Sequence, residues 1–142
     1  MQKATVEDYL KTMYILYEQQ KDKQEGIKSV EIAKIMKIKK PSVSAIVRKL
    51  EKQGFIQTKP YAPVFFTTKG LKEAIRITHN HRLIEYFLRE ILKGDLKNIH
   101  REAHRLEHAF SEATIRRLDE FLGNPKTSPY GKRIHSFNEG RQ

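Results

Sequence analysis

The sequence predicts a mainly α-helical protein that is interrupted once by a short β-ribbon. Apolar residues recur at helical spacing along most of the 142 residues, and only the stretch from Phe55 to Gly70 changes to a strand-like pattern. The composition combines 38% hydrophobic with 32% charged residues. That balance is typical of helical proteins that have a thin core and complete it by dimerising.

Residues 1–54 contain three predicted helices. The first runs from Val6 to Gln19, the second covers 29–37, and the third starts at Pro41 and ends at Gly54. Proline is favoured in a first helical turn and glycine just past the last one. The apolar stripes of the three helices are, in order, Tyr9, Leu10, Met13, Tyr14, Leu16 and Tyr17; Ile32, Ala33 and Met36; and Val43, Ile46, Val47 and Leu50.

The stretch after Gly54 predicts two short strands, because it is rich in Phe, Ile, Thr, Tyr and Val. Pro60 and Pro63 are expected in the turn between these strands, since proline cannot donate to a strand ladder. Three helices, a short link and a two-stranded ribbon together predict a winged helix-turn-helix.

The remainder of the chain predicts three more helices and a tail. Thr68 is placed to cap a long helix from Lys69 to Leu92. Two shorter helices follow, and the last segment is poor in apolar residues and therefore expected to be extended. The predicted organisation is a winged helix-turn-helix domain over 1–72, an all-helical domain over 73–125, and an extended C-terminal tail over 126–142.

Basic charge is concentrated in the N-terminal half. The chain has a formal charge of +11, and residues 1–76 hold 16 Lys and Arg against 8 Asp and Glu. Excess positive charge favours a polyanion partner through counterion release. We therefore predict binding of double-stranded DNA. The alternative is a protein–protein module whose lysines are only solvated.

The predicted DNA-contacting residues fall into three groups. Small residues at the start of the second reading helix approach base edges, basic residues around that helix meet phosphates, and two residues lie at the tip of the wing. In this order they are Pro41, Ser42 and Ser44; Lys39, Lys40, Arg48, Lys49 and Lys52; and Lys59 and Tyr61.

The stretch HREAHRLEH, residues 100–108, holds three of the six histidines. His100, His104, Glu107 and His108 are spaced i, i+4, i+7 and i+8, so they project from one helical face. A zinc-protease motif is excluded, because Arg101 rather than glutamate follows the first histidine. The remaining interpretations are a metal site and a charged helix surface.

A second set of possible ligands lies upstream. His81 and Glu85 form an i, i+4 pair on the long helix. Two helices that each present His and Glu can enclose a divalent cation, and Asp8 on the first helix offers another oxygen. Imidazole with carboxylate suits Fe, Mn, Co, Ni or Zn. His79 and His135 have no such neighbours in the sequence and are predicted to be solvated.

Several motifs in this order resemble the family of metal-dependent repressors typified by the diphtheria toxin repressor and the manganese transport regulator. The resemblance covers about residues 5–135. The matching motifs are EDYLKTMYIL, AKIMKIKKPSVSAIVRKLEKQGFI, TTKG, HRLIEYFL, HREAHRLEHAFS and GNPKTSPYGK. It implies a winged helix joined to a helical dimerisation domain, in the short form without the SH3-like domain of longer members.

The resemblance also implies two ligand sets. One metal site of the family corresponds to Asp8, His104, Glu107 and His108. The ancillary site of iron-type members corresponds to His81, Glu85 and His100, whereas in manganese-type members the histidine matching His81 belongs to a paired-metal cluster.

Two departures from the family pattern bear on the metal. Lys11 stands where manganese-type members have glutamate, which argues against their bridged binuclear site. His104 stands where members have cysteine or glutamate, so this site is richer in nitrogen. Nitrogen favours Fe, Co, Ni or Zn over Mn.

The expected function is a divalent-metal-responsive, homodimeric transcriptional regulator, a repressor of metal-uptake genes that binds a palindromic operator. Its expected cofactor is Fe²⁺ or Mn²⁺, with Co²⁺, Ni²⁺ and Zn²⁺ as alternatives. No enzyme activity or membrane association is expected, and the absence of a signal-peptide pattern predicts the cytoplasm. The alternative function is a constitutive winged-helix regulator that does not sense metal.

Overall fold

The computed structural model describes residues 3–59 and 63–142 and divides the chain into two compact units, 1–74 and 75–142. The two units are described separately. The helices are α1 (Lys3–Gln19), α2 (Ser29–Met36), α3 (Lys40–Lys52), α4 (Thr68–Glu90), α5 (Leu96–Leu106) and α6 (Glu112–Phe121), with a short 3-10 helix, η1 (Lys23–Glu25); the strands are β1 (Ile27–Lys28), β2 (Ile56–Thr58) and β3 (Pro63–Phe66).

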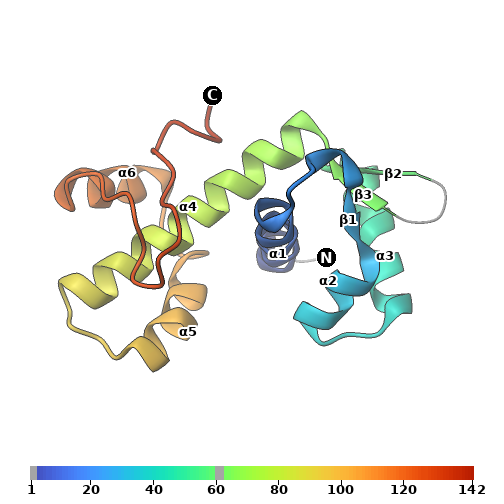
Figure 1. The fold of residues 1–142 in the computed structure, drawn as a ribbon. Coiled ribbons are helices and arrows are strands. Elements are labelled where there is room, and N and C mark those ends of the chain that lie inside the picture. The colour runs from blue at the N-terminus through green and yellow to red at the C-terminus, as the bar shows by residue number, and fades with distance from the viewer. Residues whose placement is uncertain (1–2, 60–62) are drawn as a thin grey trace. The chain divides into compact units, whose positions relative to one another are not determined.

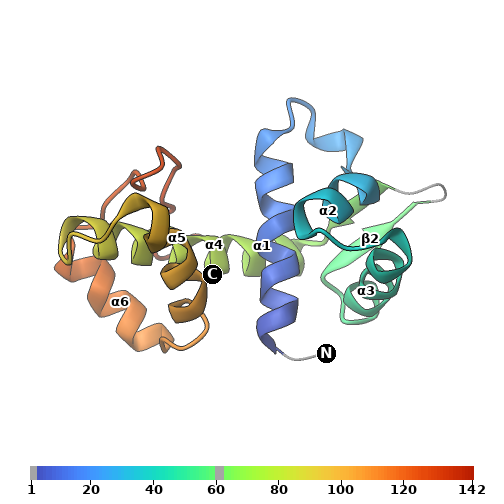
Figure 2. The same ribbon diagram turned by 90° about the horizontal axis from the view of Figure 1, so that it is seen from below.

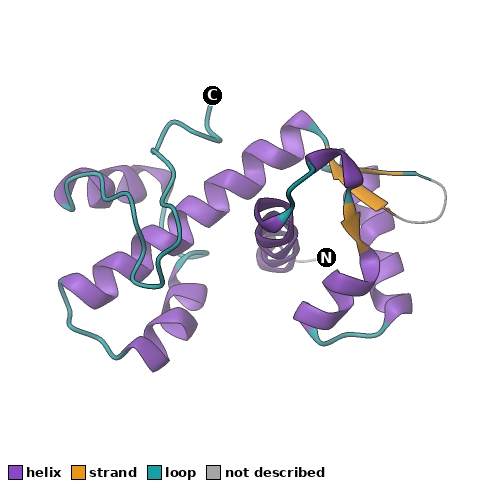
Figure 3. Cartoon of the chain, in the orientation of Figure 1, coloured by secondary structure: helices purple, strands orange, loops and turns teal. Residues whose placement is uncertain are grey.

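The first unit packs α1, α2 and α3 against a small antiparallel sheet with the strand order β1-β3-β2 (Figures 1 and 3). Its core is continuous from the first helix to the wing, because each element buries one apolar stripe. The fully or nearly buried members of this core are Tyr9, Met13, Leu16, Ile27, Ile32, Val43, Val47, Leu50, Ile56 and Val64. The winged helix-turn-helix prediction is therefore confirmed.

α3 presents one face to this core and the other to solvent. Val43, Val47 and Leu50 are buried, whereas the basic and small polar residues between them are exposed. Pro41 lies in the first turn, as predicted. Gly54 follows the C-cap residue Gln53 with a φ of 84°, which glycine adopts without strain. Figure 2 shows α2 and α3 as neighbouring helices of this unit.

Two details of the first unit differ from the sequence-based expectation. Ile27 and Lys28 form a third strand, which pairs with Val64 and Pro63. Two residues are too short a stretch to show a strand period, so this strand could not be predicted from the sequence. The placement of Pro63 in the turn was wrong. It opens β3, where its carbonyl accepts a hydrogen bond from the Lys59 N–H at 3.4 Å.

The second unit is built from most of α4 with α5 and α6. Leu83 and Ile84 of α4 pack against Ala103 of α5 and Ile115 of α6, and all four are fully buried. Ser111 caps α6, because its hydroxyl accepts a hydrogen bond from the Thr114 N–H at 3.1 Å. The predicted helical character of this half is confirmed.

The segment after α6 differs from the extended tail that the sequence predicts. It folds along the second unit, where Arg82 of α4 donates a hydrogen bond to the Arg133 carbonyl at 2.8 Å (Figure 1). Ile134 and His135 are buried, and Phe137 packs against the core of this unit. A few apolar and ring side chains thus hold a segment whose average composition is polar. The predicted boundaries at residues 72 and 125 stay predictions.

No helix within 3–59 and 63–142 is both long and apolar enough to cross a membrane. α4 has sufficient length at 23 residues, but charged side chains recur along it. Residues 77–85 of α4 are buried without interruption in the second unit.

Candidate metal centre and nucleic-acid interface

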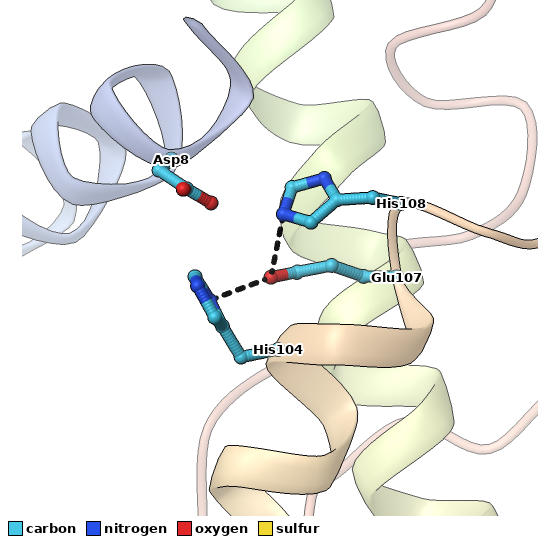
Figure 4. Close-up of side chains that lie close together, drawn as sticks. All are labelled: Asp8, His104, Glu107 and His108. Atoms are coloured by element: carbon cyan, nitrogen blue, oxygen red, sulfur yellow. Dashed lines mark ion pairs between the residues drawn. The ribbon is translucent and has the colours of Figure 1, made fainter. Parts of the chain in front are cut away.

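Three predicted ligands converge at the end of α5. Glu107 is the C-cap residue of this helix, and its buried carboxylate lies between two imidazoles (Figure 4). Its Oε1 is 3.1 Å from Nδ1 of His104 and 3.7 Å from Nε2 of His108. These three residues are called the His104 cluster. The helical spacing that brings them to one face is the one that the sequence predicts.

The upstream candidate ligands, His81 and Glu85, meet α5 one turn earlier, at His100. Oε2 of Glu85 is 2.9 Å from Nδ1 of His100 and 3.2 Å from Nε2 of His81. The two imidazole nitrogens are 3.2 Å apart. His81 and Glu85 are buried on α4, whereas the His100 side chain is 64% exposed. These three residues are called the His100 cluster.

His81 contacts both clusters. While its Nε2 faces Glu85 and His100, its Nδ1 is 3.1 Å from Oε2 of Glu107. One buried imidazole therefore stands between two buried carboxylates. This contact was not apparent from the sequence, because His81 and Glu107 lie on different elements, 26 positions apart.

The carboxylate of Glu85 is held in its ionised form. Burial raises its pKa, but hydrogen bonds and charge from His100 and His81 lower this pKa by a larger amount, to about 2. The ionised carboxylate is the form that binds a cation, and the two imidazoles bind one through the lone pairs of their neutral form.

Both clusters fit a divalent transition metal. Ligand atoms about 2.1 Å from a shared ion and about 90–110° apart lie roughly 3.0–3.4 Å from one another. The three contacts of the His100 cluster, at 2.9, 3.2 and 3.2 Å, are close to that spacing. The ligand atoms of the His104 cluster all lie within 4.8 Å of one another, so small side-chain rotations suffice there. Nitrogen and oxygen donors without sulfur suit Fe²⁺, Mn²⁺, Co²⁺, Ni²⁺ or Zn²⁺.

Asp8, which Figure 4 also draws, belongs to the first unit. It lies in the second turn of α1 and is half-buried. Lys11 follows one turn later on the same helix and is buried. The proposed role of Asp8 as a ligand stays a prediction.

His79 and His135 are buried, so the prediction that both are solvated was wrong. Nε2 of His79 is 3.0 Å from Oδ2 of Asp119 on α6, and its ring packs edge-on against Phe137. Arg141 lies beside it, with Nη1 at 3.3 Å from Nδ1 of His79. The two histidines form part of the packing of the second unit, which sequence spacing alone does not reveal.

Burial lowers the pKa of His79, and the Arg141 guanidinium lowers it further against the opposing effect of Asp119. The folded state therefore holds His79 neutral at pH values where the unfolded chain begins to bind a proton. This contribution to stability is complete above an unfolded pKa of about 6.5 and is lost as the pH falls below it.

We expect the metal-free protein to lose stability between pH 7.5 and 5.5, and His79→Gln to lose less over the same interval. Urea unfolding followed by circular dichroism at each pH measures both free energies of unfolding. The comparison isolates His79, because the two proteins differ at this position alone. Parallel pH profiles for the two proteins would contradict this assignment.

The predicted DNA-contacting residues gather on and next to α3. Lys39 is its N-cap residue, and the others up to Lys52 lie on the helix. The exposed members of the set are Lys39, Lys40, Pro41, Ser42, Ser44, Arg48, Lys49, Lys52 and Lys59. Lys59 directly follows β2, with its ammonium 4.8 Å from the centre of the Phe65 ring. Tyr61 lies outside the described residues. All nine described residues are thus accessible to a ligand.

Family models match both halves of the chain. Residues 1–64 match the iron dependent repressor, N-terminal DNA binding domain, and residues 67–136 match the iron dependent repressor, metal binding and dimerisation domain. The chain belongs to the iron-dependent repressor family. This membership confirms the resemblance that the sequence motifs indicate.

Individual proteins similar to this chain agree with the assignment. An uncharacterised HTH-type transcriptional regulator of Methanocaldococcus jannaschii is 36% identical over 118 residues, which are 83% of this chain and 92% of that protein. The iron-dependent repressor IdeR of Mycobacterium leprae is 36% identical, over 92% of this chain and 55% of its own length. The structure of the manganese regulator SloR has a TM-score of 0.74 at 36% identity, over 92% of this chain and 62% of that one. The chain therefore spans little more than half of IdeR.

Proposed function

We propose that this protein is a divalent-metal-responsive DNA-binding regulator, a repressor of metal-uptake genes, and not an enzyme. The observation that carries the proposal is the convergence of two histidines on the buried Glu107, in a chain whose other unit exposes a basic reading helix. Membership of the iron-dependent repressor family supports it. The alternative, a constitutive DNA-binding regulator, leaves the six converging His and Glu side chains without a role.

Metal binding is assigned to two ligand sets. Asp8 completes the His104 cluster, since a carboxylate on α1 gives that site four donors, and the His100 cluster forms a second site. Fe²⁺ and Mn²⁺ are the ions proposed first, because IdeR is named for iron and SloR for manganese. The extra imidazole of His104 favours Fe²⁺ of these two.

DNA binding is assigned to the exposed face of α3 and to the wing. Pro41, Ser42 and Ser44 open the helix with small side chains that leave its first turn free to approach base edges. A dimer presents two such helices to a palindromic operator. Ile91, Leu92 and Phe121 of the second unit support dimerisation, since these large apolar side chains are 46%, 59% and 70% exposed. A DNA-binding regulator of this kind acts in the cytoplasm.

The proposed mechanism links DNA binding, which is assigned to the first unit, to metal binding by the clusters of the second unit. Asp8, His104, Glu107 and His108 would hold a divalent ion, whose positive charge would offset the negative charge of the two carboxylates. Asp8 on α1 and the His104 cluster then hold one arrangement of the reading heads, which shifts the population toward the DNA-competent state. By linkage, DNA tightens metal binding by the same factor.

The decisive experiment is DNA affinity as a function of metal. Chelator-stripped protein is titrated with Mn²⁺, Fe²⁺, Co²⁺, Ni²⁺ or Zn²⁺ at fixed salt, on a promoter fragment of its own genome. At least one ion is expected to tighten binding about tenfold or more. His104→Ala is expected to lose that response. Arg101→Ala, at an exposed position next to His100, is expected to keep it. Equal affinity with chelator and with every ion would favour the constitutive regulator.

A second prediction concerns α3. Lys49→Ala is expected to weaken binding by a similar factor on every DNA sequence and to reduce the slope of log affinity against log salt by about one, because one phosphate contact is lost. Lys97→Ala removes the same charge from an exposed position on α5 and serves as the control. Fluorescence anisotropy at several salt concentrations measures both slopes. An unchanged slope in Lys49→Ala, or an equal change in Lys97→Ala, would argue against this interface.

A further inference from the structure

A small cavity lies in the first unit, where the end of α1 meets β3 and the start of α4. Its volume is about 210 Å³, which is below the range of about 300–1,000 Å³ for pockets that take drug-sized ligands. Three aromatic side chains, Tyr17, Phe65 and Phe66, line it together with the polar side chains of Gln20 and Lys23. This space is called the wing cavity, because β3 is a strand of the wing.

The walls of the wing cavity suit one aromatic ring. The ring centroids of Tyr17 and Phe66 are 5.7 Å apart and the ring planes are inclined by 77°, so the two surfaces stand almost at a right angle. Gly26 allows the third ring to come close, since a Cβ at this position would lie 2.7 Å from the ring of Phe65. Three partly buried rings around a space of this size favour a flat ring that packs edge-on or offset against them.

Two polar side chains of the wing cavity have hydrogen-bonding capacity left. Gln20 donates from Nε2 to the Gly26 carbonyl, but its buried Oε1 has no hydrogen-bond partner among the residues that the structure describes. A buried acceptor without a donor is unfavourable, so a group that donates to it is bound favourably. Lys23 donates to the carbonyls of Tyr17 and Gln20, the latter at 2.8 Å, and an ammonium has a third N–H. The cavity therefore offers one acceptor and one cation.

We infer that the wing cavity binds a small aromatic carboxylate that carries a hydroxyl or amino group next to the carboxylate. The ring packs against the three aromatic side chains. The carboxylate pairs with Lys23, and the neighbouring O–H or N–H donates to Oε1 of Gln20 after a small rotation of that side chain. The site involves neither a metal ion nor the two histidine clusters, so it goes beyond the proposed function.

Occupation of the wing cavity acts on DNA binding through Phe65. The Lys59 ammonium lies 4.8 Å from the centre of the Phe65 ring, and Lys59 is one of the residues assigned to DNA. An anion in the cavity that this ring lines brings negative charge toward Lys59 and opposes its attraction to phosphate. The ligand is therefore an effector that weakens DNA binding, against the proposed effect of the metal.

The test follows the binding of anthranilate (2-aminobenzoate) to the full chain by ¹⁵N and aromatic ¹³C NMR titration. A Kd of about 1 mM is expected for a ligand of this size. Nuclear Overhauser effects from the ligand ring are expected to the rings of Tyr17, Phe65 and Phe66. A Kd above about 5 mM, or binding without contacts to these rings, overturns the site.

Benzoate tests the role of Gln20, because it has the same ring and carboxylate but no amino donor. It is expected to bind about fivefold more weakly than anthranilate, as the loss of one hydrogen bond predicts. Equal affinity for the two compounds would show that Oε1 of Gln20 takes no donor from the ligand, and overturns this part of the assignment.

Lys23→Met tests the cation, since it keeps the length of the side chain and removes the charge. It is expected to weaken anthranilate binding about fivefold. Lys21→Met is the matched control, because Lys21 is exposed and lies outside the cavity, and its affinity is expected to equal that of the wild type. Circular dichroism checks that both variants are folded. An unchanged Kd in Lys23→Met, or an equal change in both, overturns the pairing of the carboxylate with Lys23.

The effect on DNA is measured by fluorescence anisotropy with anthranilate at about ten times its Kd, and with acetate at the same ionic strength as the control. DNA affinity is expected to fall about threefold in the wild type and to stay unchanged by anthranilate in Lys59→Ala. Equal DNA affinity in anthranilate and acetate overturns the effector role. Anthranilate binding requires neither metal nor DNA, so a failed titration leaves metal-responsive regulation standing, and a missing metal response leaves the titration unchanged.

Discussion

Replacing Glu107 with Gln is expected to weaken metal binding at the His104 cluster by about 100-fold. The substitution keeps the shape of the side chain and removes its negative charge. Glu107 contacts three imidazoles through its two carboxylate oxygens, and its side chain is completely buried. An amide offers one weaker oxygen donor, and its NH₂ group cannot accept from His81 or bind a cation. The metal-dependent increase in DNA affinity is expected to disappear in this variant as well.

Glu102→Gln provides the matched control for this experiment. It makes the same chemical change within α5, but Glu102 is exposed and pairs with Arg105, at 3.7 Å. Calorimetric titration with Mn²⁺ or Co²⁺ compares both variants with the wild type, and circular dichroism checks that each is folded. Wild-type metal affinity in Glu107→Gln would remove the His104 cluster from the proposed mechanism.

Replacing Gly70 with Ala is expected to destabilise the first unit by about 3 kcal/mol, at the upper end of the range for overpacking. Helix propensity alone favours the opposite sign, since alanine is better than glycine inside a helix by about 1 kcal/mol. Gly70 lies in the first turn of α4, where an added Cβ would be 1.8 Å from the backbone oxygen of Phe55. Backbone cannot move aside as a side chain does.

Hydrogen bonds around the backbone oxygen of Phe55 limit how the chain can relieve this steric clash. The Phe55 carbonyl accepts a hydrogen bond from the Thr67 N–H at 3.1 Å, and the Thr67 hydroxyl donates to the Gly54 carbonyl at 2.6 Å. Moving Phe55 away from α4 would break the junction of wing and helix. Urea unfolding measures the change, and Lys72→Ala, exposed on the same helix, is the control with an expected change within about 0.5 kcal/mol. Equal or greater stability in Gly70→Ala would refute the steric argument.

The elements that local periodicity specifies were predicted correctly from the sequence. The stripe Val43, Val47 and Leu50 defines the buried face of α3, and Pro41 marks its first turn. The spacing of His104, Glu107 and His108 likewise places three candidate ligand residues on one side of the chain at the end of α5. Helical geometry over one or two turns depends on neighbouring residues, so the sequence contains the required information.

Some local features could not be predicted from a sequence pattern. Ile27 and Lys28 become a strand only because β3 lies beside them, and Pro63 joins that strand although proline usually indicates a turn. The pairing partner is more than thirty residues away, and two residues carry no period of their own.

The sequence by itself determined the fold class, the basic reading helix and the residue types of the two candidate ligand sets, because periodicity, charge and motif order are properties of nearby residues. Only the tertiary structure decided which helix faces meet. It buried His79 against Asp119, brought the backbone of Phe55 against Gly70, and placed the ring of His81 between Glu85 and Glu107. These contacts depend on the packing of elements distant in the chain, where a shift of about one ångström makes or removes a hydrogen bond.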